Sequence, residues 1–96
     1  MEFNLNRIQY VILSILRKNK ADSPMLSMSC NEIAEIEKYD KPSTIYKHLR
    51  ILENLGYVER GAKVERATGY IITAAGLKYY QIIFQKTHRR IKTWKD

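Results

Sequence analysis

Cationic and hydrogen-bonding side chains recur along residues 43–54 at a spacing that gathers them on one side of a helix. At about 3.6 residues per turn, these side chains are Ser43, Lys47, Arg50 and Asn54. Leucine and isoleucine side chains of the same stretch fall on the opposite side. A cationic face rich in donors suits an anionic partner, and the alternative is a helix face that is merely solvated. We interpret it as a binding face.

Catalytic and metal-binding patterns are missing from the sequence. No nucleophile, base and orienting group occur at a typical spacing, so we expect no enzyme. His48 falls on the apolar side of the same helix, and we interpret it as a partly buried structural histidine. The single cysteine, Cys30, excludes an intramolecular disulfide and the paired-cysteine zinc patterns. It should lie beside the core, although cross-linking of two subunits or oxidant sensing are alternatives. We expect no metal and no cofactor.

Size and charge narrow the class of protein further. The chain has 96 residues, which suffice for one small domain. Its formal net charge of +7 favours a polyanionic partner, although such a balance also serves solubility. No stretch approaches about 20 apolar residues, and the opening MEFNLNR lacks the order of a signal peptide. We therefore expect a cytoplasmic protein without membrane contact.

The first part of the chain predicts two helices. Asn4 or Asn6 can cap a first helix that runs to about residue 18 and is apolar around more than one face. Such a helix should be buried on two sides, one of which we assign to a partner subunit. Residues 22–24 form a turn signal, and residues 25–28 could supply a very short strand. Residues 29–32 then have the form of a capping box that starts a second helix, which should stop near Tyr39.

A third helix and a hairpin follow. Pro42 suits the first turn of a helix from about Lys41 to Leu55, and Gly56 suits a left-handed C-cap. Residues 57–60 and 70–72 predict two strands joined by a turn region, 61–69, that carries Lys63 and Arg66. The sequence thus predicts a hairpin with a basic tip.

The last helix should be long and should begin at Thr73, which can cap it. Large, mostly apolar side chains recur along it at alternating spacings of three and four residues: Leu77, Tyr80, Phe84, Thr87, Ile91 and Trp94. Such a stripe predicts a seam between two subunits, and the alternative is packing within one subunit. Together with Ile8 and Ile12 of the first helix, these residues are the expected dimer interface.

This order of elements predicts a mainly α fold with a small β-hairpin wing, a winged helix-turn-helix. Residues 1–73 would form the DNA-binding part, and residues 74–96 a C-terminal dimerisation helix of the same single domain. The helix at about 41–55 would enter the major groove, and the wing at about 57–72 would reach the flanking backbone or minor groove. The expected DNA contacts are Lys41, Ser43, Thr44, Tyr46, Lys47, Arg50, Asn54, Arg60, Lys63 and Arg66.

Two segments also carry a family resemblance. Residues 42–59 read PSTIYKHLRILENLGYVE, and residues 70–76 read YIITAAG. With these segments the chain resembles winged-helix transcriptional regulators, most closely the PadR-type branch and more widely the MarR-type proteins. The resemblance implies a homodimer that binds double-stranded DNA through the face from Ser43 to Arg50 and dimerises through its final helix. No small-molecule effector is evident.

Two other functions fit the same sequence. A winged helix can serve as a protein-interaction module, which predicts no binding to duplex DNA near physiological salt. It can also be an architectural or replication-associated binder, which predicts similar affinity for every duplex and strong salt dependence.

Overall fold

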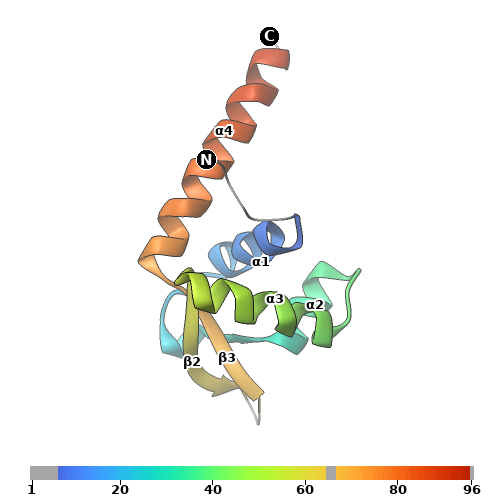
Figure 1. The fold of residues 1–96 in the computed structure, drawn as a ribbon, viewed down its shortest axis with the longest axis vertical. Helices are drawn as coiled ribbons and strands as arrows, with labels where there is room; N and C mark the ends of the chain where they lie inside the picture. The colour runs from blue at the N-terminus through green and yellow to red at the C-terminus, as the bar shows by residue number, and fades with distance from the viewer. Residues whose placement is uncertain (1–6, 65–66, 96) are drawn as a thin grey trace.

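Four helices and a three-stranded sheet form the described part of the chain, residues 7–64 and 67–95, in a computed structural model (Figure 1). The helices are α1 (Arg7–Lys18), α2 (Cys30–Glu37), α3 (Pro42–Leu55) and α4 (Ala74–Lys95). The strands are β1 (Met28–Ser29), β2 (Val58–Val64) and β3 (Ala67–Ile72), and a short 3-10 helix, η1 (Pro24–Leu26), precedes β1. The predicted mainly α winged helix-turn-helix is confirmed.

The ends of α2 and α3 follow the sequence signals. Ser29 and Glu32 form the expected capping box, in which the Ser29 N–H donates to the Glu32 carboxylate at 3.0 Å and the Glu32 N–H donates to the Ser29 hydroxyl at 3.3 Å. The helix ends at Glu37, slightly before the expected Tyr39. Gly56 closes α3 with φ of 85°, a left-handed conformation that glycine adopts without strain.

The core lies between the three N-terminal helices and β3. Its fully or almost fully buried members include Leu13, Leu16, Ile33, Ile45, Leu49, Leu52, Tyr70 and Ile72. Full burial of a side chain of this size contributes about 1.5–3 kcal/mol, so the inner stripe of α3 is firmly held. This packing fixes which face of α3 points outward.

Ile12 corrects one expectation about α1. The helix is buried on more than one side, as its composition predicted, but its own chain covers Ile12 completely, to 0% exposure. Ile12 has no surface left for a partner, so its assignment to a dimer interface is wrong. Ile8 is half-buried and keeps some accessible surface.

The sheet has the strand order β1-β3-β2, and both pairings are antiparallel. Met28 pairs with Tyr70, and Val58 pairs with Ile72. The expected turn region at 61–69 is wrong in extent, because β2 continues to Val64 and β3 already begins at Ala67. The register shifts between Arg60 and Lys63, so a bulge occurs where the sequence suggested a turn.

Thr73 joins the end of α3 to the start of α4. Its hydroxyl accepts a hydrogen bond from the Gly76 N–H at 3.0 Å and donates one to the Gly56 carbonyl at 2.7 Å. The predicted Thr73 cap is thereby confirmed. Beyond its first turns, α4 projects away from the rest of the molecule (Figure 1).

Candidate nucleic-acid interface

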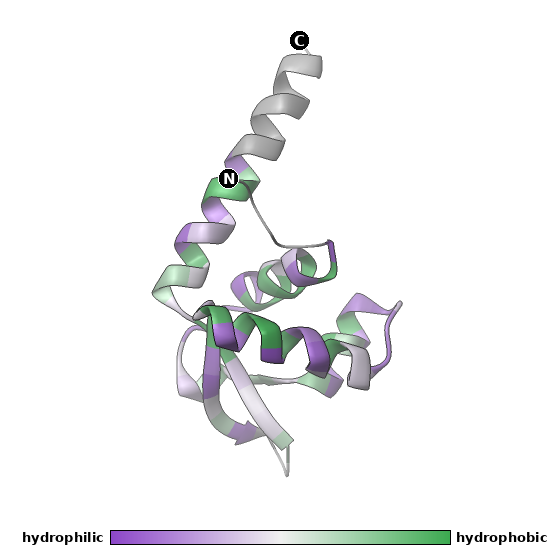
Figure 2. Cartoon of the chain, in the orientation of Figure 1, coloured by the Kyte–Doolittle hydropathy of each residue, from purple (hydrophilic) through white to green (hydrophobic). Residues whose placement is uncertain are grey.

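The outer face of α3 is open to solvent, as its sequence pattern predicted. Ser43, Lys47, Arg50 and Asn54 are all exposed, as is the N-cap residue Lys41. Hydrophilic parts of α3 and β2 lie next to each other in Figure 2, and an ion pair joins the two elements. The packing of the inner stripe therefore leaves the polar side chains of α3 facing outward.

The N-terminus of α3 suits an anion. Lys41 occupies the N-cap with extended backbone and makes no side-chain capping bond, and Pro42 follows it in the first turn. Thr44 is half-buried there, whereas Ser43 is exposed. Because the positive end of the helix dipole lies beside a lysine and a hydroxyl, a phosphate would be stabilised at this end.

Tyr46 and Arg50 form a pair one turn apart on α3. The Arg50 Nη1 donates to the Tyr46 hydroxyl at 3.1 Å, and the guanidinium carbon lies 5.9 Å from the centre of the ring. This hydrogen bond raises the pKa of Arg50 further above its already high ordinary value. Tyr46 is 42% exposed. The two side chains thus occupy the outer surface together.

Glu53 connects this pair to the wing. Its Oε1 lies 3.7 Å from the Arg50 Nε, and its Oε2 lies 3.1 Å from the Arg60 Nε on β2. We refer to Arg50, Glu53 and Arg60 as the arginine–glutamate bridge. The pairing of Glu53 could not be predicted from the sequence, because Arg60 stands in another element. Arg60, which the sequence suggested only as a DNA contact, is exposed but also forms an ion pair within the chain.

Ser27 anchors the other side of the wing. Its hydroxyl accepts a hydrogen bond from the Ala62 N–H at 3.0 Å and donates one to the Pro24 carbonyl at 2.9 Å. A Cβ at Gly61 would collide with this hydroxyl, so glycine allows the close approach. Lys63 is exposed on β2, whereas Arg66 lies outside the described residues.

The turn between α2 and α3 is held by a buried carboxylate. Glu37 accepts hydrogen bonds from the N–H groups of Tyr39 and Asp40, at 3.0 and 2.8 Å. Burial acts to raise the pKa of Glu37, but these hydrogen bonds outweigh it and the pKa is lowered. The side-chain hydrogen bond to Glu37, with some burial, raises the pKa of Asp40. The pKa values of the two neighbouring carboxyl groups are therefore shifted in opposite directions.

His48 and Cys30 occupy structural positions. The Nδ1 of the half-buried His48 lies 3.1 Å from the Gln9 amide nitrogen, which ties α3 to α1. The prediction of a partly buried structural histidine is confirmed. Cys30 is half-buried and packs against the core. Among residues 7–64 and 67–95, no group of histidine, cysteine and carboxylate side chains is placed to hold a metal ion.

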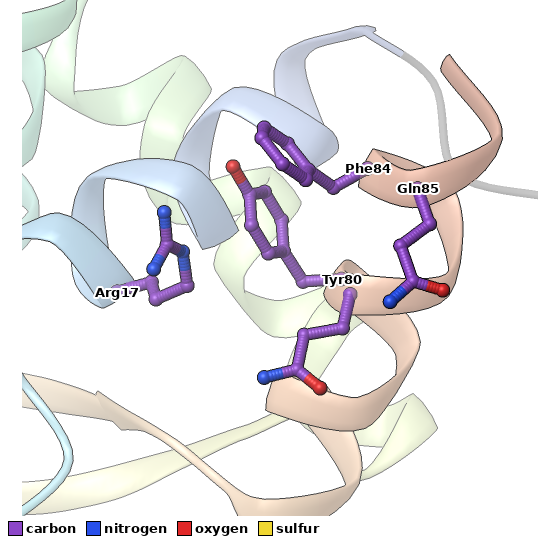
Figure 3. A pocket seen from close by; sticks show the side chains of 5 residues that line it. Arg17, Tyr80, Phe84 and Gln85 are labelled. Carbon is purple, nitrogen blue, oxygen red and sulfur yellow. The ribbon is translucent and has the colours of Figure 1, made fainter. Parts of the chain in front are cut away.

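Aromatic side chains join α4 to α1, as Figure 3 shows for Tyr80 and Phe84 beside Arg17. The Tyr80 ring stacks on Tyr10 with centroids 5.1 Å apart and on Phe84 at 5.8 Å, and the Arg17 guanidinium carbon lies 5.1 Å from the Tyr80 centroid. Burial, aided by a hydrogen bond with Tyr80, raises the pKa of Tyr10 to about 12. The base of α4 is therefore fixed to its own subunit.

Within its own subunit, α1 therefore covers only part of the predicted stripe of α4. Tyr80 is 3% exposed and packs on its own α1, so its assignment to a dimer interface is wrong. Leu77 and Phe84 are half-buried and keep accessible surface. The side chains of Thr87, Ile91 and Trp94 lie outside the part of the chain whose side chains are described. In the described part, no helix is long and apolar enough to span a membrane.

Comparison by sequence finds no relative. No protein-family model matches the chain, and no curated protein matches it.

Solved structures of similar shape do exist. The DNA complex of Staphylococcus aureus MepR superposes with a TM-score of 0.75 at 18% identity, over 96% of this chain and 72% of that one. A MarR/EmrR family transcriptional regulator from Acinetobacter gives a TM-score of 0.73 at 18% identity, over 97% of this chain and 62% of that one. TubR from Bacillus megaterium pBM400 gives a TM-score of 0.70 at 20% identity, over 81% of this chain and 84% of that one.

These neighbours establish the fold. The chain has the winged-helix fold of MarR-type regulators, whose members among the neighbours are transcription regulators and not enzymes. Likeness to the PadR-type branch in particular finds no specific support among them. At these identities the similarity concerns the fold alone, so function depends on the residues of this chain.

Proposed function

We propose that the chain is a sequence-specific, double-stranded DNA-binding transcriptional regulator that acts as a homodimer in the cytoplasm. The observation that carries the proposal is the open cationic face of α3, which the buried stripe of the same helix holds outward. A helix with exposed cations and donors on one side matches the width and chemistry of the major groove.

In this function α3 enters the major groove from its N-terminal end. Ser43, Lys47 and Arg50 face base edges, where arginine or lysine donates to guanine O6 and N7. The open helix terminus at Lys41 and the exposed Lys63 of the wing bind phosphates, which set position without reading sequence. Tyr46 packs beside them on a sugar or a thymine methyl group.

We assign DNA binding to residues 1–73 and dimerisation to residues 74–96, which contain α4. The C-terminal part of this helix projects beyond the body of the subunit (Figure 1). Ile8, Leu77 and Phe84 keep accessible surface near its base, and the sequence stripe continues to Trp94. An apolar stripe on a projecting helix favours pairing with a second copy. Assignment to the PadR-type branch rests on residues 42–59 and stays a prediction.

The neighbours lend support by what is known of them. MepR has been solved bound to DNA and is described as a transcription regulator of a multidrug efflux pump, and a TubR fragment from Clostridium botulinum is described as DNA-binding. This chain shares their fold and adds its own cationic face on α3.

One experiment tests the proposal against both rivals. Labelled duplexes obtained by selection, and random duplexes of equal length, are titrated with the protein at several salt concentrations, and the mass of the protein is measured in the same buffer. The proposal expects tighter binding of selected duplexes by a dimer. Equal affinity for all duplexes would indicate a non-specific architectural binder. Absence of binding would indicate a protein-interaction module.

A further inference from the structure

We propose that Glu53 is a positioning residue that fixes Arg50 for base reading and thereby sets the specificity of the interface. This inference rests on the proposed function and adds a residue to it. An acidic side chain on a DNA-facing surface calls for such an explanation, because it opposes the approach of phosphates.

The geometry gives Glu53 two arginine partners from two elements. Its two carboxylate oxygens face the Nε atoms of Arg50 on α3 and Arg60 on β2, at 3.7 and 3.1 Å. Without the carboxylate, two like charges would lie close together and repel, and each long side chain would populate more rotamers. The bridge therefore holds both guanidinium groups near the positions that they need when DNA arrives.

Arg50 is held from both sides by this arrangement. Tyr46 binds its Nη1 at 3.1 Å, and Glu53 faces its Nε. A guanidinium has five N–H donors, so the Nη2 group and one Nη1 hydrogen remain available. This end-on pair of donors matches guanine O6 and N7, which the commonest specific contact uses. The protein thus presents one edge of Arg50 before binding.

The negative charge of Glu53 should lower the affinity for random DNA and raise the affinity for selected DNA. On a random duplex, where phosphate attraction dominates, the Glu53 carboxylate lowers affinity through repulsion. On a selected duplex, the ordering of Arg50 before binding saves conformational entropy and favours the base contact. Glu53 would therefore increase discrimination through both effects.

The test compares Glu53→Gln with Glu59→Gln. Both variants remove one negative charge, and Glu59 is an exposed residue of β2, next in sequence to Arg60. The affinities for selected and random duplexes are measured for wild type and for both variants. For Glu53→Gln we expect the affinity for random duplexes to rise and the affinity for selected duplexes to fall. The ratio of selected to random affinity should then fall by roughly tenfold. For Glu59→Gln the ratio stays constant.

A second arm shows whether Glu53 acts through Arg50. In an Arg50→Ala background, Glu53→Gln should no longer change the ratio, because the side chain that it positions is absent. In the free protein, NMR relaxation of the Arg50 Nε–Hε group should show motion of larger amplitude in Glu53→Gln than in wild type. Thermal unfolding confirms that each variant is folded.

Each outcome gives a decision. A rise of both affinities by the same factor in Glu53→Gln, as in Glu59→Gln, would overturn the positioning role. So would a fall in the ratio that persists at full size without Arg50. Failure of the wild type to bind any duplex would instead overturn the proposed function, and unchanged motion of the Arg50 Nε–Hε group in Glu53→Gln would then refute the ordering of Arg50 as well.

Discussion

The guanidinium of Arg50 donates to the hydroxyl of Tyr46, one turn earlier on α3, at 3.1 Å. Because the hydroxyl oxygen accepts this bond, its own hydrogen is left to donate outward. An exposed tyrosine and an arginine thus form one unit, in which the arginine stays cationic and the phenol becomes a donor.

Tyr46→Phe should weaken binding to a selected duplex. The variant keeps the ring but removes the acceptor of Arg50 and an outward donor, and a hydrogen bond of this kind contributes about 0.5–1.5 kcal/mol. Titration of a labelled duplex measures the loss. Tyr39→Phe is the matched control, because Tyr39 is 84% exposed in the turn before α3. Equal affinities of Tyr46→Phe and wild type would contradict a role for the hydroxyl.

Arg50→Ala should cost about 1–3 kcal/mol on a selected duplex and much less on random DNA, since it removes a base contact. Lys63→Ala provides the comparison, because a phosphate contact from the wing should weaken all sequences alike and flatten the salt dependence. Titrations at three salt concentrations measure both effects. Equal losses on selected and random duplexes for Arg50→Ala would refute its base-reading role.

Gly76→Ala should destabilise the fold by about 1–3 kcal/mol, the usual cost of overpacking. A Cβ at this position would collide with the backbone carbonyl of Tyr57, which cannot move aside as a side chain could. Gly56→Ala is the comparison, since its Cβ would enter open space and meet only the strain of φ 85°, about 1–2 kcal/mol. Urea unfolding measures both. Full stability of Gly76→Ala would contradict the close packing of α4 on Tyr57.

Asp40→Asn should raise the melting temperature at pH 7, with a gain that shrinks toward pH 4. The raised pKa of Asp40 means that the folded chain binds its proton more tightly than the unfolded chain does. That stability is complete below the unfolded pKa of about 3.9 and is lost as pH rises through the folded value. An asparagine amide can donate to Glu37 at every pH. Thermal unfolding across this range measures the gain, and a constant difference would refute the linkage.

Glu37 has the opposite dependence. Its pKa is lowered in the folded chain, so its contribution is present above the unfolded value of about 4.3 and is lost as pH falls through the folded one. Part of the acid unfolding of the wild type should therefore be absent in Glu37→Gln.

Ile91→Glu should convert a dimer into a monomer. Ile91 belongs to the apolar stripe that the sequence places along the last helix, and a charge in such a seam would be desolvated without a partner. Thr93→Glu introduces the same charge at a position off the stripe. Sedimentation equilibrium measures the mass of both variants. A dimer that persists in Ile91→Glu would contradict the proposed seam.

Local signals predicted the helix ends well. The capping box at Ser29, the glycine at 56 and the threonine at 73 each satisfy backbone groups within a few residues. Such local caps can therefore be predicted from the sequence. The open face of α3 was equally predictable, because the inner stripe alone decides which side is buried.

Interactions between distant elements could not be predicted in this way. Gly61 suggested a turn, but it lies at a strand bulge beside Ser27, a contact 34 residues away in the chain that the sequence does not reveal. Glu53 gains its role from Arg60 on β2. The spacing of Tyr80 indicated an apolar stripe correctly, yet it could not tell whether α1 or a second subunit would cover that stripe.

The Thr73 hydroxyl, which bridges the Gly56 carbonyl and the Gly76 N–H, also has a consequence for the target. It ties the start of α4, through which two copies would associate, to the end of α3, the proposed recognition helix. In a symmetric pair, the angle between these two helices dictates how far apart the two reading helices stand, and so how many base pairs separate the repeats of a palindrome. Together with the contacts of Tyr80 on α1, the Thr73 side chain would thus help to set the half-site spacing of the target.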